Sequence, residues 1–355
     1  MSTATTVATT AVATTSEPTT LVTPVRVEAV ERLSPAFVRV TFGGPGLADL
    51  STADGFDTRF KVVFPGPTGL LPAPASTPEQ WQESWRAMPD AERSPMRTYT
   101  IREITTARDE VRLVTDFVVH EASGDSDGLH GSGGHDSALG PACRWALSAA
   151  VGDVVHIVGP HRRSPMYGGT EFEPGDLRDL LLIGDETALP AIARILEDIG
   201  PGYTGHAFVE VPTAADIPVL PGHDLVDVTW LPRDGARQGH PLVAAVRAHL
   251  GLPPADLDAP LPEVPSTLDV EVWETPRYSS AGEDLGDPAA SATRPVGAAS
   301  VPTSPRPDLG DTYAWIAGES WCVRALRRVL VSELGVERSR VAFMGYWREG
   351  VAMRS

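Results

Sequence analysis

The sequence predicts two domains of different class, an antiparallel β-barrel followed by a parallel-sheet α/β domain. Three observations support this prediction. The chain has 355 residues, which is enough for two domains that each bury a core. Apolar and polar residues alternate in short segments up to about residue 158, and strand and helix patterns alternate after residue 175. We set the bounds at 1–22 for a disordered tail, 23–165 for the first domain and 166–355 for the second.

Six segments of the first domain have the period-two pattern of half-buried strands, broken by Gly and Pro. They are residues 22–33, 36–44, 59–65, 97–104, 110–120 and 153–160. Such short, evenly spaced strands are typical of an antiparallel barrel or sandwich. Residues 70–95 predict a loop with a short helix, and residues 121–140 predict a loop rich in Gly, Ser and Asp.

The second domain reads as repeated strand–helix units. Predicted strands cover residues 177–185, 206–212, 226–233, 268–275, 312–320 and 341–350, and predicted helices cover 186–200, 240–252 and 321–335. This alternation indicates a parallel sheet. A segment near 275–309, rich in Pro, Ala, Ser and Gly, cannot bury enough apolar surface to order itself and predicts a mobile insertion.

Composition excludes several classes of function. The net charge of −18 argues against a nucleic-acid binder. The sequence contains no run of eighteen apolar residues, so no transmembrane helix is expected. The N-terminal segment lacks the basic region of a signal peptide, so we expect a cytoplasmic protein. We also expect a monomer. Cys143 and Cys322 cannot hold a metal cluster alone, and no HxxxH or CxxC spacing occurs, so no metal site is expected. Lys61 is the only lysine, so an anion site must be built from Arg or His.

The stretch RTYTIRE, residues 97–103, opens a strand with unusual polar groups. Arg97 and Tyr99 share one face of that strand, and Thr98 and Thr100 share the other. A guanidinium can bind phosphate and a phenol ring can cover an aromatic group. Taken alone, these residues favour the simpler interpretation of a surface arginine and a half-buried tyrosine.

Three further segments follow in order: DFVVH at 116–120, GPACRWALSA at 140–149 and GDETALPAI at 184–192. With RTYTIRE, and with the later AGES and YWREG segments, they resemble the siderophore-interacting protein family, the ferric-siderophore reductase branch of the ferredoxin-reductase-like flavoproteins. The resemblance runs from about residue 25 to 350. It implies that the first domain binds FAD and the second binds NAD(P)H.

The resemblance implies a set of cofactor contacts. Arg97 would meet the FAD phosphate, Tyr99 would lie against the isoalloxazine and Thr100 would bond near its reactive edge. Asp116, Val118 and His120 would line FAD through backbone and side chain, although His120 taken alone favours a strand-end histidine with a local hydrogen bond. The helix start at Gly140, Ala142 and Trp145 would take the pyrophosphate, since Pro141 suits a first turn and free N–H groups bind anions.

The nicotinamide side would be formed by Asp185, Glu186 and Thr187, with Glu319, Ser320 and Trp347 at the same ridge. GDETALPAI lacks the GxGxxG fingerprint, and helix capping by Asp185 or Thr187 is the alternative interpretation. Trp347 is equally well explained as a core residue. Glu210 could accept from a ribose hydroxyl of NADH, and Arg233 could meet the extra phosphate of NADPH. We favoured NADPH.

Substrate contacts are expected from basic residues, because ferric siderophores are commonly anionic. The candidates are His161, Arg162, Arg163, Arg324, Arg328 and Arg348. For any one of them, a solvated side chain or a contact with the NADPH phosphate is the favoured alternative.

The resulting prediction is an FAD enzyme that passes hydride from NAD(P)H to FAD and reduces Fe(III) in a hydroxamate or catecholate siderophore by single electrons, releasing Fe(II). Ferredoxin is a second possible donor. The alternatives are a general NAD(P)H flavin or ferredoxin-type reductase, and a module that binds the ferric siderophore without turnover.

Overall fold

The computed structural model describes residues 19–51, 55–72, 75, 77–107, 110–120, 139–164, 169–220, 224–258, 273–275 and 309–350. Residues 1–18 of the predicted tail, the Gly, Ser and Asp loop over 121–138 and the insertion over 276–308 lie outside these ranges. The first strand begins at Thr20, three residues before the expected start of the first domain at residue 23.

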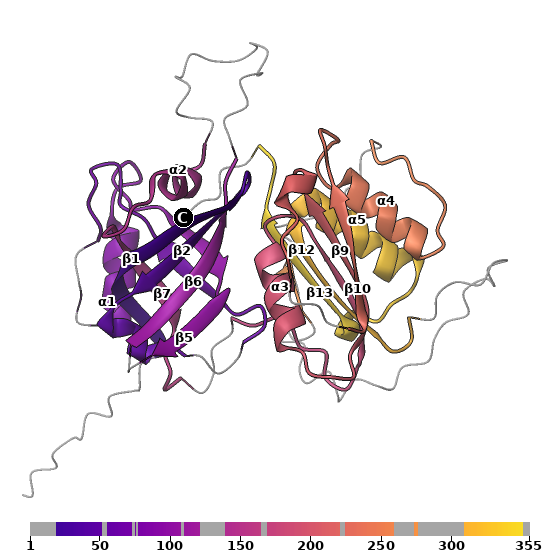
Figure 1. Ribbon diagram of the computed structural model, residues 1–355, viewed down its shortest axis with the longest axis horizontal. Coiled ribbons are helices and arrows are strands. Elements are labelled where there is room, and N and C mark those ends of the chain that lie inside the picture. The colour runs from indigo at the N-terminus through magenta and orange to yellow at the C-terminus, as the bar shows by residue number, and fades with distance from the viewer. Residues whose placement is uncertain are drawn as a thin grey trace, which may run out of the picture.

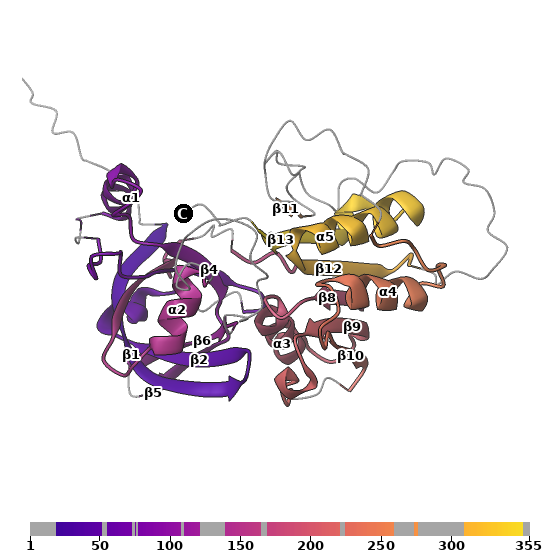
Figure 2. The ribbon, with the colours of Figure 1, turned by 90° about the horizontal axis from the view of Figure 1, so that it is seen from above.

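The first domain is a curled antiparallel sheet of seven strands in the order β4-β3-β7-β1-β2-β6-β5, which confirms the predicted class (Figures 1 and 2). The strands are β1 (Thr20–Ser34), β2 (Phe37–Gly43), β3 (Arg59–Val63), β4 (Met96–Thr100), β5 (Glu103–Ala107), β6 (Glu110–Val118) and β7 (Val154–Pro160). The sheet curls far enough for Tyr99 of β4 to pack on Phe117 of β6, with ring centroids 4.4 Å apart.

Two helices cover this sheet. α1 (Pro78–Ala87) falls in the predicted loop and begins at Thr77, whose hydroxyl accepts from the Gln80 N–H. Its buried Trp81 and Trp85 pack on Val63 of β3. α2 (Pro141–Ser148) turns Ala142 and Ala146 toward the barrel core. The apolar face of each short helix therefore fixes its position on the sheet.

The second domain is a six-stranded sheet in the order β10-β9-β8-β12-β13-β11, parallel except for the edge strand β11. Its strands are β8 (Asp179–Gly184), β9 (Thr204–Val211), β10 (Val226–Pro232), β11 (Trp273–Glu274), β12 (Thr312–Glu319) and β13 (Val341–Trp347). The predicted parallel α/β architecture is confirmed.

Helices cover both faces of this second sheet, because its central strands are apolar on both sides. In β8, Leu180 and Leu182 pack with α3 (Leu189–Asp198), while Leu181 and Ile183 face the opposite layer. That layer contains α4 (His240–His249) and α5 (Ser320–Arg327), and α5 continues as a π-helix over Arg328–Glu333 (Figure 2).

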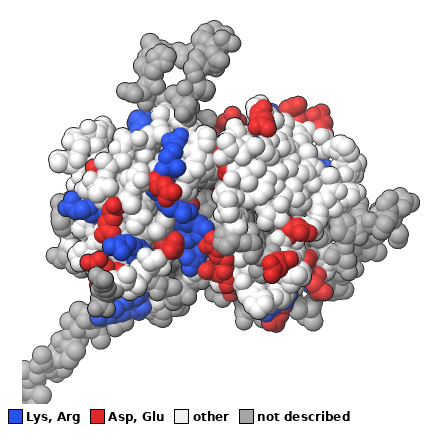
Figure 3. Space-filling view, in the orientation of Figure 1, with Lys and Arg blue, Asp and Glu red and all other residues white. Residues whose placement is uncertain are grey.

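The two domains share a packed seam, with Ala36 and Phe37 of the first domain in one core cluster with α3 and β8. Polar contacts cross the same seam. Arg102, which follows β4, forms an ion pair with Glu197 of α3. In the space-filling view, basic side chains gather on the first domain and reach acidic side chains where the domains meet (Figure 3). Burial and ion pairing together fix one domain against the other.

Candidate functional site

Three of the motifs singled out in the sequence meet in the first domain, although 12 or more residues separate them along the chain. Tyr99 of β4 lies against Phe117 of β6, and Phe117 lies 5.4 Å from the ring of Trp145 in α2, measured between centroids. Cys143 of α2 accepts a hydrogen bond from the backbone N–H of His120 at 3.4 Å. β4, the end of β6 and the start of α2 therefore form one site.

The start of α2 has the features of an anion-binding helix terminus. Gly140 is its N-cap residue and Pro141 occupies the first turn, and among the residues that the structure describes no side chain caps the helix N–H groups. Among the described residues, a Cβ added at Gly140 would meet no atom within 4 Å, so the space at this position is open. Free N–H groups and the positive end of the helix dipole favour a phosphate at such a place.

The side chains of β4 fit a flavin nucleotide beside this helix. Arg97 is half-buried and donates to the Met96 carbonyl at 2.8 Å, and burial lowers the pKa of its guanidinium. A charge held partly away from water gains more from an anion than an exposed one does. Tyr99 is half-buried with its ring in the aromatic cluster, and burial raises the pKa of its hydroxyl above the usual range. Thr100 is buried at the end of the strand.

Trp145 has a packing role in the structure. Its ring centroid lies 6.2 Å from that of Phe42, on which it stacks, and 5.2 Å from that of Phe64. The side chain therefore points into the barrel core and holds α2 on the sheet. The backbone at Gly140 and Ala142 is what the helix presents at its start.

The DFVVH segment divides between two surroundings. Asp116 is buried, and its carboxylate accepts from Arg39 at 2.7 and 2.8 Å. Arg102 lies 3.8 Å from the same carboxylate. Val118 packs into the core shared by the two domains, whereas His120 is exposed beside α2. The side chains of Asp116 and Val118 are therefore committed to the domain seam, and His120 lies at the opening.

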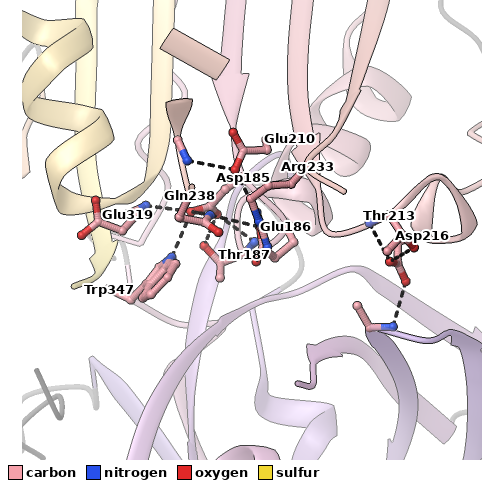
Figure 4. A network of polar contacts seen from close by, with 12 residues as sticks. Asp185, Glu186, Thr187, Glu210, Thr213, Asp216, Arg233, Gln238, Glu319 and Trp347 are labelled. Atoms are coloured by element: carbon pink, nitrogen blue, oxygen red, sulfur yellow. Dashed lines mark hydrogen bonds and ion pairs between the residues drawn. The ribbon is translucent and has the colours of Figure 1, made fainter. Parts of the chain in front are cut away.

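The second set of predicted residues converges at the carboxyl edge of the parallel sheet (Figure 4). Asp185 follows β8, and its Oδ2 accepts from the Glu319 N–H at 2.8 Å and from the Trp347 indole at 2.9 Å. Thr187 donates to Oδ1 through its N–H at 2.9 Å. The Ser320 hydroxyl donates to the Trp347 carbonyl at 2.8 Å. Glu319 and Ser320 therefore share a ridge with Asp185, as expected.

Asp185 is 2% exposed and its environment is strongly acidic. Burial and the neighbouring Glu186 raise the pKa of this carboxyl to about 7, against the opposite effect of the donors on Thr187 and Trp347. A carboxyl that titrates near neutral pH at the end of a parallel strand is typical of functional sites. The alternative interpretation was capping of the following helix by Asp185 or Thr187. Asp185 accepts from the Thr187 N–H, but the N-cap residue of α3 is Ala188, which makes no side-chain capping bond. At the start of α5, the carboxylate of Glu319 accepts from the Trp321 and Cys322 N–H groups.

Glu210 and Arg233, the alternative candidates for a ribose and a phosphate contact, are both paired within the protein. Glu210 is fully buried, and its oxygens accept from Gly239 N–H at 2.9 Å and Leu242 N–H at 3.2 Å at the start of α4. Arg233 lies between Glu210 at 2.8 Å and Glu186 at 3.0 Å. Both side chains are used within the protein, because a buried charge must be paired.

The six basic candidates do not form one patch. His161, Arg162 and Arg163 follow β7 in the first domain. His161 is buried and accepts from the Arg163 N–H, and Arg162 pairs with Asp49 at 2.9 Å. Arg328 lies 4.0 Å from Glu333.

Two of the six basic candidates lie beside the edge described above. Arg324 donates to the Ser320 carbonyl at 3.1 Å, and Arg348 follows Trp347 directly. Both side chains are exposed. Since Ser320 bonds to Trp347, these two arginines flank one point of the carboxyl edge.

Gln238 was missed by the sequence analysis. Its amide donates to Asp185 at 3.4 Å and to Glu186 at 3.3 Å. Arg102, inside RTYTIRE, was also overlooked as the link between Asp116 and Glu197. Neither has a local signal, because their partners lie far away in sequence.

Comparison with known proteins agrees with this arrangement. A family model described as the siderophore-interacting FAD-binding domain matches residues 26–164, and one described as siderophore-interacting protein matches residues 177–350. The chain belongs to the siderophore-interacting protein family, in the flavoprotein class that the fold of both domains defines.

Individual relatives extend the comparison. An uncharacterised protein of Mycobacterium tuberculosis is 33% identical over 240 residues, which cover 64% of this chain and 74% of the relative. Ferric vibriobactin reductase ViuB of Vibrio cholerae is 25% identical over 321 residues, covering 90% of this chain and 86% of the relative. A siderophore utilization protein from T. fusca has a similar solved structure, with a TM-score of 0.61, 26% identity and coverage of 94% and 95%.

Within the residues that the structure describes, no helix is both long and apolar enough to cross a membrane. The same residues contain no group of three or more His, Cys, Asp or Glu side chains arranged to hold a metal ion.

Proposed function

We propose that the protein is an FAD-dependent reductase of ferric siderophores that takes its electrons from NAD(P)H. The observation that carries the proposal is the meeting of β4, β6 and the uncapped start of α2 at one site. Membership of the siderophore-interacting family and the likeness to ferric vibriobactin reductase support it.

The first domain has the groups that an FAD molecule needs. The open start of α2 would hold the pyrophosphate with its N–H groups, and the half-buried Arg97 would pair with a phosphate. Tyr99 would present its ring to the isoalloxazine, and Thr100 would bond near the edge of that ring system. A bound flavin supplies the conversion between a two-electron donor and one-electron transfer, which the side chains cannot supply.

Ferric iron enters as substrate, held by the oxygen donors of the siderophore. Those donors bind Fe(II) much more weakly than Fe(III), so reduction releases the metal without a protein ligand. We propose that Arg324 and Arg348 attract the anionic complex, because both are exposed and flank the Ser320–Trp347 contact. Such attraction should weaken as ionic strength rises.

The decisive experiment is anaerobic. The purified protein is loaded with FAD, reduced with NADH or NADPH and mixed with a ferric hydroxamate or a ferric catecholate, and Fe(II) is trapped with a chromogenic chelator. Loss of the flavin absorbance near 450 nm, followed by its return with formation of the Fe(II) chelate, is the expected result.

Two outcomes contradict the proposal in different ways. If the ferric complexes bind but a flavin is neither present nor accepted, the protein is a siderophore-binding module. If the reduced flavin is not reoxidised by ferric siderophore but is reoxidised by other acceptors, the protein is a general reductase.

The double variant Arg324→Gln, Arg348→Gln should raise the KM for the ferric complex and leave the rate of flavin reduction unchanged. The exposed Arg86→Gln, on α1, serves as the matched control.

A further inference from the structure

The carboxyl edge of the second sheet contains a charge arrangement that bears on the choice of donor, and the inference from it rests on the proposed function. In open α/β sheets a dinucleotide lies outside the carboxyl ends of the strands, and the residue that ends the second strand meets the adenine ribose. That strand is β9, near whose end lies Glu210, and Arg233 follows the adjacent β10. The 2′-phosphate that distinguishes NADPH from NADH would therefore approach Arg233.

Arg233 is already neutralised by two carboxylates (Figure 4). Its Nη1 and Nη2 donate to Glu186 at 3.0 Å each, and Nη1 also donates to Glu210 at 2.8 Å. The carboxylates are 1% and 0% exposed, against 14% for the Arg233 side chain. Burial alone would lower the pKa of Arg233, but the bonds and charges of Glu186 and Glu210 raise it above the usual range. The guanidinium is therefore fixed inside the protein rather than presented to a ligand.

The part of this edge around Arg233 is acidic, whereas the exposed Arg324 and Arg348 lie beside the Ser320–Trp347 contact. Asp185 and Glu319 are buried at the same edge, and Glu186 and Glu210 are the two carboxylates that contact the Arg233 guanidinium. The starts of α4 and α5, which could attract a phosphate, are capped by Glu210 and Glu319. A phosphomonoester brings about −1.5 to −2 charges at neutral pH. The 2′-phosphate of NADPH would therefore meet the net negative charge of the Arg233, Glu186 and Glu210 group. NADH has an uncharged hydroxyl at that position of the ribose.

We propose that Glu186, by holding Arg233 against Glu210, makes the protein select NADH over NADPH, contrary to the preference taken from the sequence. The pyrophosphate and nicotinamide are common to both donors, so they cancel in the comparison. Arg237 is the alternative partner for the 2′-phosphate, because its side chain is exposed, although it lies 3.3 Å from Asp258.

The test measures binding as well as turnover. Titration calorimetry of the FAD-loaded protein with NAD⁺ and with NADP⁺ gives the ratio of the two dissociation constants, and stopped-flow reduction of the flavin by NADH and NADPH gives the ratio of rates. We expect at least about tenfold tighter binding of NAD⁺, the scale of one unit charge acting near a protein surface. Glu186→Gln should move this ratio toward NADP⁺ by about tenfold. Glu83→Gln, the same change at an exposed position of α1, should leave it unchanged.

Each remaining outcome decides the question. Equal or tighter binding of NADP⁺ by the unaltered protein overturns the inference, and Arg237→Gln then shows whether Arg237 holds the phosphate. If Glu186→Gln does not fold, the ratio for the unaltered protein still decides. If neither nicotinamide binds, while protein reduced with dithionite still reduces ferric siderophore, the inference fails and flavin-dependent siderophore reduction stands. If dithionite-reduced protein also fails with ferric siderophore, the proposed function fails with it.

Discussion

Asp216 joins the two domains, and its removal should uncouple them. It ends the short 3-10 helix η3 (Ala214–Asp216) after β9, and it is 2% exposed. Its Oδ1 accepts from the Ser34 hydroxyl at 2.7 Å and from the Ala36 N–H at 2.8 Å, both in the turn between β1 and β2. Its Oδ2 accepts from the N–H and hydroxyl of Thr213 at 3.1 and 2.7 Å. One carboxylate thus caps a helix in one domain and holds a turn of the other.

The size of the effect follows from these four contacts. Asp216→Ala leaves the buried Ala36 N–H without an acceptor, which costs about 1–3 kcal/mol, and removes the charge-assisted bond from Ser34. Loss of the cap at Thr213 adds about 1 kcal/mol. We expect a total destabilisation of about 3–4 kcal/mol. Asp216→Asn keeps one acceptor oxygen but turns an amide N–H toward another donor, so it should cost about half as much.

Urea unfolding followed by circular dichroism measures this loss, and Asp216→Ala should lower the midpoint by about 1 M. Burial would raise the pKa of Asp216, but the bonds from Ser34 and Thr213 bring it below the usual value. The stabilisation is therefore present above the unfolded pKa of about 3.9 and is lost as pH falls through the lower folded pKa. The exposed Asp227→Ala is the control. An Asp216→Ala protein within about 0.5 kcal/mol of the unaltered chain at pH 7 would refute the reasoning.

Three other predictions test the two sites. Arg97→Ala should raise the FAD dissociation constant by about 10- to 100-fold, through loss of a charge-assisted contact; unchanged flavin retention after ultrafiltration would make Arg97 a plain surface residue. Because the folded pKa of Asp185 is raised to about 7, its protonated form stabilises the fold below about pH 4, and this contribution is lost as pH rises through 7. Between pH 5 and pH 8 the melting temperature of the unaltered protein should therefore fall relative to that of Asp185→Asn, whose side chain does not ionise. A difference that stays constant over this range would contradict the raised pKa. Gly318→Ala should destabilise the fold by about 2–4 kcal/mol, since its φ is +141° and the new Cβ would lie 2.6 Å from Asp185 Oδ2; Gly200→Ala, with open space around it, should be neutral, and equal melting temperatures for the two variants would remove the steric argument.

The class of both domains was predictable from the sequence because it depends on local patterns. Alternation with period two over 110–120 gives β6 one face toward the barrel core, as Phe117 shows, and one toward the second domain, as Val118 shows. The apolar run before Asp185 is buried on both faces, as a central parallel strand must be. Gly140 and Pro141 mark the start of a helix within a few residues, so α2 was also within reach.

The charge pairing was not predictable, because it depends on distances in space that sequence spacing does not contain. Arg233 was expected to meet a ligand, yet the sheet order places it beside Glu186, which lies 47 residues earlier in the chain. The expected contact of Asp116 with the flavin stays a prediction, and the register of β2 against β6 places Arg39 opposite it, a pairing that the sequence did not indicate. Trp145 was expected at the pyrophosphate, and the structure adds a packing contact of its ring with Phe42.

The sequence by itself therefore determined the two architectures and the segments that form the candidate sites, since hydrophobic periodicity and helix-start residues act over a few positions. Only the tertiary structure decided which polar groups remain available to a ligand. A buried charge must find a partner of opposite sign, and that partner is set by strand order, register and domain packing rather than by its neighbours in the chain.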